Sequence, residues 1–211
     1  MKKEFEYYNE LAKEVVNNYN TWLNPADVVL NPSMETAEHI TISSLIPTEL
    51  GLKIQELVEK FLAIDESLII KDPSLYHFTV YWCPIGSDVE GLRKILVEEI
   101  EKEKLEFDVK GLLFGPLGIS LEMFATNDAL INIRQRMADH IGAKYKKDER
   151  GVTTWVNLIR YSQIPKIEVK KFVQENSQID FGHFVPSEIG FYKSKHKNFE
   201  GVEELFVVAN K

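Results

Sequence analysis

The stretch of sequence that decides the fold is Leu75–Cys83, which reads Leu-Tyr-His-Phe-Thr-Val-Tyr-Trp-Cys. It is rich in aromatic and β-branched residues and alternates in polarity, which is the pattern of a half-buried β-strand. Successive side chains of a strand point to opposite faces. We therefore expect a mixed face with His77, Thr79, Tyr81 and Cys83, and an apolar face with Phe78, Val80 and Trp82.

The mixed face of this strand carries a titratable imidazole two residues from a hydroxyl group. On a rigid strand, the side chains of His77 and Thr79 lie parallel to one another, roughly 7 Å apart along the chain. This spacing suits a phosphate-sized group held between them. The pair is therefore the first candidate for a functional site.

The composition is that of a globular protein with one large domain or two small lobes. The chain has 211 residues, of which 44% are hydrophobic and 27% are charged. Its formal net charge of −8 argues against binding of duplex DNA, which needs clustered Lys and Arg. The single cysteine excludes an intramolecular disulfide framework, and no Cys/His cluster has the spacing of a metal site. We find neither an apolar stretch of about 20 residues nor a secretory leader, so we expect neither membrane binding nor export. With the single cysteine, this favours a cytoplasmic protein, and the sequence predicts no bound metal or cofactor.

The order of the remaining elements predicts the fold class. Most of the expected strands alternate in polarity, which favours antiparallel sheets with helices on one side over a parallel sheet. The sequence thus predicts an α+β fold over 38–211, with two pseudo-symmetric lobes of antiparallel sheet, helices packed outside and a central cleft. An N-terminal helical extension over 1–37 precedes it. We expect strands at about 38–46, 75–83, 105–114, 118–125, 152–161, 185–195 and 202–209, helices at about 3–23, 48–62, 88–103, 128–141 and 166–176, and loops at 144–150 and 180–184.

The first expected strand, 38–46, has polar residues on one side. His39, Thr41 and Ser43 alternate with two isoleucines. A polar face on an otherwise apolar strand indicates that this strand borders the cleft.

The strand at 152–161 also has a distinct face. Strict alternation places Trp155 and Asn157 together on one side, with Thr153 and Ile159. It places Arg160 on the opposite side, outside the predicted site.

Five segments together resemble the 2H phosphoesterase superfamily, which includes 2′-5′ RNA ligase-like proteins and cyclic phosphodiesterases. The resemblance covers about 38–209 and implies a bilobal fold with two His-x-Thr/Ser motifs facing one another across a cleft. It also implies that one histidine acts as general base and the other as general acid, while the hydroxyl residues bind phosphate oxygens. The segments are His39-Ile-Thr-Ile-Ser-Ser-Leu-Ile-Pro-Thr-Glu49, His77-Phe-Thr-Val80, the glycine-rich hairpin Gly111–Gly118, Trp155-Val-Asn-Leu-Ile-Arg160 and Ile189-Gly-Phe-Tyr-Lys-Ser194.

The second motif departs from the family pattern. Trp155 stands 78 positions after His77, where the second histidine belongs, and Asn157 stands where the hydroxyl residue belongs. An indole N–H donates a hydrogen bond but does not shuttle a proton near neutral pH. Each acid–base participant contributes about 10²–10⁴ in rate, so we expect two-histidine catalysis to be crippled. The side-chain NH₂ group of Asn157 is still a hydrogen-bond donor that can reach a phosphate oxygen.

Three functions fit this pattern. The first is binding of a phosphorylated small molecule, a nucleotide or an RNA end without efficient chemistry, with Trp155 stacking on a base. The second is an active phosphodiesterase of altered mechanism, in which His77 works with water, a substrate group or His39. The third is a non-catalytic interaction module, which the N-terminal helix and the net acidity favour.

The predicted site combines these candidates. His77 and Thr79 are the candidate catalytic residues. Tyr81 joins them through its place on the same strand face, and the strand at 38–46 contributes two residues because its polar side borders the cleft. The candidate ligand-binding residues are Asn157, Trp155, Tyr81, His39 and Thr41.

Overall fold

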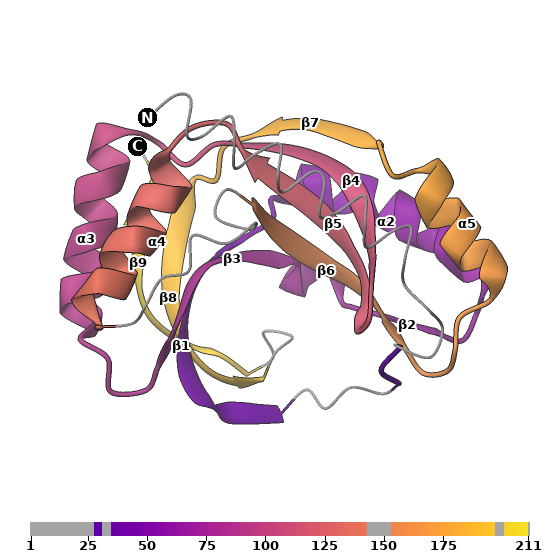
Figure 1. Cartoon of the computed structure of the whole chain (residues 1–211), viewed down its shortest axis with the longest axis horizontal. Coiled ribbons are helices and arrows are strands. Elements are labelled where there is room, and N and C mark those ends of the chain that lie inside the picture. Colours follow the sequence, from indigo (N-terminus) through magenta and orange to yellow (C-terminus); the bar gives the residue numbers. More distant parts are fainter. Residues whose placement is uncertain (1–27, 31–34, 143–152, 197–200, 211) are drawn as a thin grey trace.

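The structure, a computed structural model, describes residues 28–30, 35–142, 153–196 and 201–210 (Figure 1). It confirms the predicted α+β class, with two antiparallel sheets and helices around them. The helix expected at 3–23, and with it most of the predicted 1–37 extension, lies outside the described residues. So does the loop expected at 144–150.

Two antiparallel sheets form the centre of the molecule. Sheet A has the strand order β3-β1-β8-β9, and sheet B has the order β2-β6-β5-β4-β7. Each sheet joins segments that are far apart in sequence. Sheet A contains β1 (Glu35–Leu45), β3 (His77–Pro84), β8 (Glu188–His196) and β9 (Glu203–Ala209). Sheet B contains β2 (Leu68–Ile70), β4 (Phe107–Gly115), β5 (Gly118–Ala125), β6 (Thr153–Tyr161) and β7 (Asp180–Phe184).

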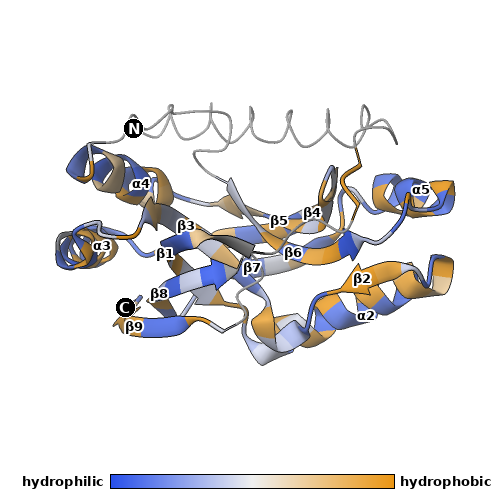
Figure 2. Ribbon diagram, turned by 90° about the horizontal axis from the view of Figure 1, so that it is seen from below, coloured by the Kyte–Doolittle hydropathy of each residue, from blue (hydrophilic) through white to orange (hydrophobic). Residues whose placement is uncertain are grey.

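Four α-helices within the described residues pack outside the sheets. α3 (Val89–Lys102) and α4 (Ala129–His140) lie together at the sheet A end of the molecule, and α2 (Thr48–Ile64) and α5 (Ile167–Glu175) lie together at the other end (Figure 1). The helices carry bands of hydrophobic and of hydrophilic residues (Figure 2). In α3, for example, the buried apolar residues recur every three or four positions, so one side of the helix faces the core.

The core runs continuously from one sheet to the other. The ring of Phe78 on β3 lies 5.0 Å from the ring of Phe107 on β4 and 6.1 Å from the ring of Phe184 on β7, measured between centroids. Such edge-on aromatic contacts contribute about 0.5–1.5 kcal/mol beyond the burial of apolar area. The apolar side of β3 is therefore fixed against sheet B.

Two strands differ from the sequence prediction. Residues 180–184 were expected as a loop but form β7, and β2 was not expected at all. Both are edge strands of sheet B, each with one pairing partner. Segments of three to five residues are too short for a periodic pattern, and pairing with β4 or β6 determines their conformation.

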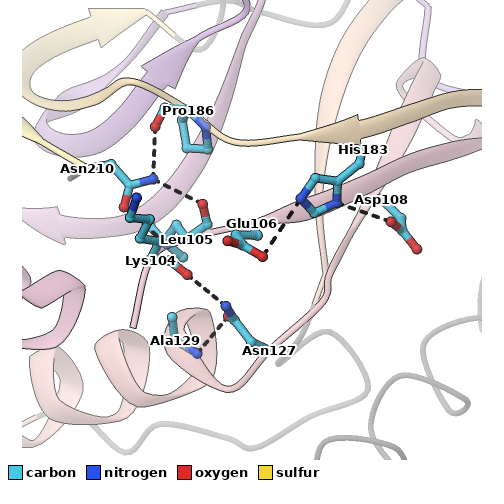
Figure 3. A network of polar contacts seen from close by, with 9 residues as sticks. All are labelled: Lys104, Leu105, Glu106, Asp108, Asn127, Ala129, His183, Pro186 and Asn210. Atoms are coloured by element: carbon cyan, nitrogen blue, oxygen red, sulfur yellow. Dashed lines mark hydrogen bonds and ion pairs between the residues drawn. The ribbon is translucent and has the colours of Figure 1, made fainter. Parts of the chain in front are cut away.

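A polar network joins the two sheets where β9 ends (Figure 3). The buried side chain of Asn210 accepts a hydrogen bond from the backbone N–H of Leu105 at 3.1 Å and donates to the carbonyl oxygens of Leu105, at 3.0 Å, and Pro186, at 2.8 Å. Nearby, just before α4, the side chain of Asn127 accepts from the backbone N–H of Ala129 at 3.1 Å and donates to the carbonyl oxygen of Lys104 at 2.8 Å. These side chains satisfy backbone groups that no strand or helix pairs.

The histidine of the edge strand β7, His183, lies in the same region. His183 on β7 lies between two carboxylates of sheet B, with Nε2 3.7 Å from Glu106 and Nδ1 3.5 Å from Asp108 (Figure 3). All three side chains are substantially exposed. These contacts join β7 to β4 at the surface and lie apart from the two motif strands.

Candidate functional site

An extra residue in β3 sets which of its side chains share a face. Ile42 of β1 lies opposite Tyr81 and the next residue, Ser43, lies opposite Thr79, so Val80 has no partner in the ladder. Such a bulge shifts the alternation by one position. His77 and Thr79 therefore keep the common face that the sequence predicted.

Beyond this bulge the predicted alternation is wrong. Tyr81 lies opposite Ile42 and Cys83 lies opposite Ile40, so both turn toward the apolar side, where Cys83 is fully buried. Trp82 lies opposite Thr41 and joins the polar side, where it is 52% exposed. The expectation that Tyr81 lines the site with His77 is thereby corrected, and Trp82 takes that place.

β6 contains the same irregularity. Asn157 lies opposite Ser120 and Ile159 lies opposite Ile119, so Leu158 is the extra residue. Trp155 and Asn157 share a face, as predicted, but Ile159 turns into the core.

The bulge in β6 also moves Arg160 to the polar side. Its Nη1 donates to Oδ1 of Asn157 at 3.1 Å, and the same oxygen accepts from the hydroxyl of Ser120 at 3.1 Å. Strict alternation had placed Arg160 outside the site, and the extra residue overturns that placement.

The two bulges make β3 and β6 equivalent. The spacing of 78 residues that separates His77 from Trp155 also separates Thr79 from Asn157 and Trp82 from Arg160. Each set of three side chains lies on one face because each strand has an extra residue after the second position. The polar faces of the two sheets therefore present corresponding positions.

Side chains from sheet B and α4 hold these strands together. Arg134 of α4 donates to the carbonyl oxygens of Val80, at 2.9 Å, Thr79, at 3.3 Å, and Thr153, at 2.8 Å. The hydroxyl of Thr154 donates to the carbonyl oxygen of Thr79 at 2.9 Å. The segments that carry the two motifs are thus in direct contact.

His77 is buried beside a lysine. Its Nδ1 lies 2.9 Å from the carbonyl oxygen of Leu75 and 3.1 Å from Nζ of Lys71. Burial, with the positive charges of Lys71 and Arg160, lowers the pKa of His77 to about 3, against the opposing effect of the Leu75 hydrogen bond. The imidazole is therefore neutral at physiological pH.

Lys71 comes from the segment that follows β2. Its backbone N–H donates to the carbonyl oxygen of Leu158, the extra residue of β6, at 3.1 Å. Lys71 thus connects the two motif strands, since its backbone is bonded to β6 and its side chain reaches His77 on β3.

Hydroxyl groups continue the polar face across sheet A. The hydroxyl oxygens of Thr41 and Ser43 lie 2.8 Å apart, and the hydroxyl of Ser43 donates to that of Thr79 at 3.4 Å. The structure thus brings Thr41 and Thr79 into one row of hydroxyls.

His39 lies at the far end of this face. It is opposite Pro84, whereas His77 is opposite Leu45, six positions along β1, which corresponds to about 20 Å. The ring of His39 lies 5.5 Å from that of Trp82, and its Nδ1 lies 3.0 Å from the carbonyl oxygen of Ala37. The structure does not bring His39 to His77.

Similarity to known proteins lies mainly in the fold, since no family model matches the chain. The platelet adherence protein A of Streptococcus gordonii is 28% identical over 116 residues, which are 54% of this chain and 3% of that protein. The chain therefore spans a small fraction of the length of this curated relative.

Solved structures match most of the chain. A structure titled as a phosphoesterase covers 82% of this chain and 98% of its own, at 14% identity and a TM-score of 0.53. Escherichia coli LigT complexed with ATP covers 82% and 98%, at 12% identity and a TM-score of 0.54. LigT complexed with NADP+ covers the same shares, at 15% identity and a TM-score of 0.53.

This chain has the fold of LigT and of the phosphoesterase structure. Within this fold, β3 and β6 are the strands on which the sequence predicted the two motifs. The chain has His77 and Thr79 at the first pair of positions, and Trp155 and Asn157 at the second.

Three residues of this candidate site were not expected from the sequence, namely Trp82, Arg160 and Lys71. Arg160 was misplaced, although its spacing of 78 residues from Trp82 was a usable signal once a bulge was assumed. Lys71 belongs to no motif and reaches His77 only through the folding of β2 against β6.

Among the described residues, no group of three or more His, Cys, Asp or Glu is arranged to hold a metal ion. No described helix is long and apolar enough to cross a membrane.

Proposed function

We propose that this chain binds the phosphate group of a nucleotide or an RNA end between β3 and β6, and that its two-histidine catalysis is impaired. The observation that carries the proposal is the placement of two cations on the motif residues. Lys71 contacts His77, and Arg160 contacts Asn157. In a chain of net charge −8, a local pair of cations marks the place where an anion gains most.

The electrostatics of Arg160 favour an anionic ligand. Burial lowers the pKa of its guanidinium, because a buried positive charge loses hydration. A phosphate group beside it would compensate for this loss through charge-assisted hydrogen bonds, which are about twice as strong as neutral ones.

Neutral donors are present on both strands. The hydroxyl of Thr79 belongs to the row that includes Ser43. Oδ1 of Asn157 accepts from Ser120 and Arg160, so the amide is oriented with its NH₂ group directed elsewhere. This orientation makes the NH₂ group a donor suited to a phosphate oxygen.

Trp82 supports a nucleotide as the ligand. It is a large, exposed aromatic side chain on the same face as Thr79, beside the ring of His39. Stacking of a base on such a ring contributes about 1–3 kcal/mol. The LigT structures contain ATP and NADP+, which supports the same class of ligand on this fold.

The chain has no histidine at the second motif position, so one of the two acid–base groups is missing there. Trp155 holds the position of the second imidazole, and the pKa of about 3 keeps His77 neutral. A single neutral imidazole performs at most one of the two proton transfers. Loss of one acid–base group costs about 10²–10⁴ in rate.

Calorimetric titration with 3′-AMP, inorganic phosphate and adenosine tests the proposal. We expect 3′-AMP to bind more tightly than phosphate and adenosine to bind weakest, because the phosphate group supplies the charged contacts. Equal affinity for adenosine and 3′-AMP, or no binding of 3′-AMP at millimolar concentration, would contradict the phosphate site. Rapid hydrolysis of a 2′,3′-cyclic nucleotide by the unmodified chain would contradict impaired catalysis.

A further inference from the structure

Two polar groups beside Nδ1 of His77 have opposite hydrogen-bonding requirements. Nδ1 of His77 lies 2.9 Å from the carbonyl oxygen of Leu75 and 3.1 Å from the ammonium of Lys71. A carbonyl oxygen only accepts hydrogen bonds, and an ammonium only donates them. The carbonyl therefore favours a proton on Nδ1, and the ammonium favours a lone pair there.

The position of this proton decides whether Nε2 of His77 is a hydrogen-bond donor or an acceptor toward a ligand. A neutral imidazole carries a single N–H. With the proton on Nδ1, the other nitrogen, Nε2, has a lone pair and acts as an acceptor or a base. With the proton on Nε2, that nitrogen is a donor toward a phosphate oxygen and does not take up a second proton readily.

We propose that Lys71 selects the Nε2–H tautomer of His77 and thereby makes this histidine a phosphate donor instead of a general base. A hydrogen bond from an ammonium is about twice as strong as one between neutral groups. The opposite tautomer would also direct the Nδ1–H dipole toward the positive charge of Lys71. The donor role toward a ligand rests on the proposed phosphate site, whereas the tautomer follows from contacts of the chain itself.

The surroundings of His77 hold both neighbours in place. The backbone N–H of Lys71 is bonded to the carbonyl oxygen of Leu158. Leu75 ends the short 3₁₀ helix Pro73–Leu75, and its N–H donates to the carbonyl oxygen of Asp72 at 2.9 Å. Burial and the positive charges of Lys71 and Arg160 lower the pKa of His77 to about 3, so the imidazole is neutral and the choice between tautomers applies at pH 7.

Long-range proton–nitrogen correlation spectra of the ligand-free, ¹⁵N-labelled chain test the proposal. In the unmodified chain we expect a pyridine-type signal for Nδ1 of His77 and a pyrrole-type signal for Nε2. Lys71→Met should exchange the two signal types, and Lys71→Arg should retain the original pattern because it keeps a charged donor. Lys110→Met is the matched control, since Lys110 pairs with Asp108 on β4, and it should leave the His77 signals unchanged.

Either of two results would overturn the role of Lys71: a pyrrole-type Nδ1 in the unmodified chain, or an unchanged pattern in a folded Lys71→Met variant. If that variant does not fold, the spectrum of the unmodified chain decides alone. Titration with inorganic phosphate separates this inference from the proposed function. An Nε2–H tautomer in a chain that binds no phosphate supports the role of Lys71 and overturns the phosphate site. Phosphate binding by a chain with an Nδ1–H tautomer overturns the role of Lys71 alone.

Discussion

Nη1 of Arg160 donates a hydrogen bond to Oδ1 of Asn157 at 3.1 Å, because the extra residue Leu158 turns both side chains to the same side of β6. This contact places a positive charge beside Asn157, at the position where the family resemblance predicts a hydroxyl residue. It is the reason why we expect an anion to bind here, although Trp155 stands where the resemblance predicts a second histidine.

Arg160→Met should weaken binding of 3′-AMP and of inorganic phosphate to a similar degree. Hydrogen bonds to charged groups contribute about 1.5–3 kcal/mol, so we expect a loss of roughly 10- to 150-fold in affinity by calorimetry. Arg93→Met is the control, since Arg93 is exposed on α3 and pairs with Glu90. Equal loss in both variants would mean that only overall charge matters.

Trp82→Ala should separate the base from the phosphate. If Trp82 stacks on the base, the affinity for 3′-AMP falls by roughly 5- to 150-fold while the affinity for inorganic phosphate stays the same. Tyr81→Phe is the comparison on the same strand, because Tyr81 faces the apolar side, and it should change neither affinity. A stronger effect of Tyr81→Phe than of Trp82→Ala would contradict the assignment of faces beyond the bulge.

Restoring the second motif should restore catalysis. Trp155→His and Asn157→Thr supply the missing imidazole and hydroxyl, and Lys71→Met gives His77 the tautomer of a general base. We expect this triple variant to hydrolyse a 2′,3′-cyclic nucleotide measurably faster than the unmodified chain. Adding His77→Ala should abolish this gain. Fast turnover by the unmodified chain that disappears with His39→Ala would contradict the prediction, because His39 lies about 20 Å along the sheet from His77.

Burial of His77 predicts a loss of stability toward acid. The pKa of His77 is about 3 in the folded chain and near 6.5 in the unfolded chain, so between these values the unfolded state binds more protons. Its contribution is fully present above pH 6.5 and falls by about 1.4 kcal/mol per pH unit as the pH decreases toward 3. Urea unfolding at pH 7, 6 and 5 measures this slope. His77→Gln should flatten it, and an unchanged slope in that variant would show that other groups cause it.

Asn210→Leu should destabilise the fold without affecting the site. The substitution removes three hydrogen bonds and leaves backbone groups of Leu105 and Pro186 without them (Figure 3). Each buried unsatisfied group costs about 1–3 kcal/mol, so we expect a loss of at least 2 kcal/mol in the free energy of unfolding. Asn127→Ala, which removes two hydrogen bonds just before α4, should cost about 1 kcal/mol. The reverse order of the two losses would contradict the importance of the Asn210 network.

The sequence predicted what depends on local periodicity and missed what depends on pairing. Alternation located β3 and β6 and placed His77, Thr79, Trp155 and Asn157 on the correct faces of their strands. A bulge is defined by the register of two strands, so the alternation of polarity in the sequence does not reveal the extra residues Val80 and Leu158. Every face assigned beyond them was inverted.

The contacts of Lys71 illustrate a second limit. Lys71 follows β2, an edge strand of only three residues, and meets His77 because β2 pairs with β6. Nothing in its neighbourhood in the sequence indicates an anion site. The position of Lys71 beside His77 depends on how the two sheets pack together.

A crystal structure of the chain soaked with 3′-AMP tests the proposed phosphate site most directly. We expect the phosphate oxygens to lie within hydrogen-bond distance of Nε2 of His77, the NH₂ group of Asn157 and the guanidinium of Arg160. A nucleotide bound elsewhere, or no nucleotide between β3 and β6 at millimolar concentration, would contradict the site.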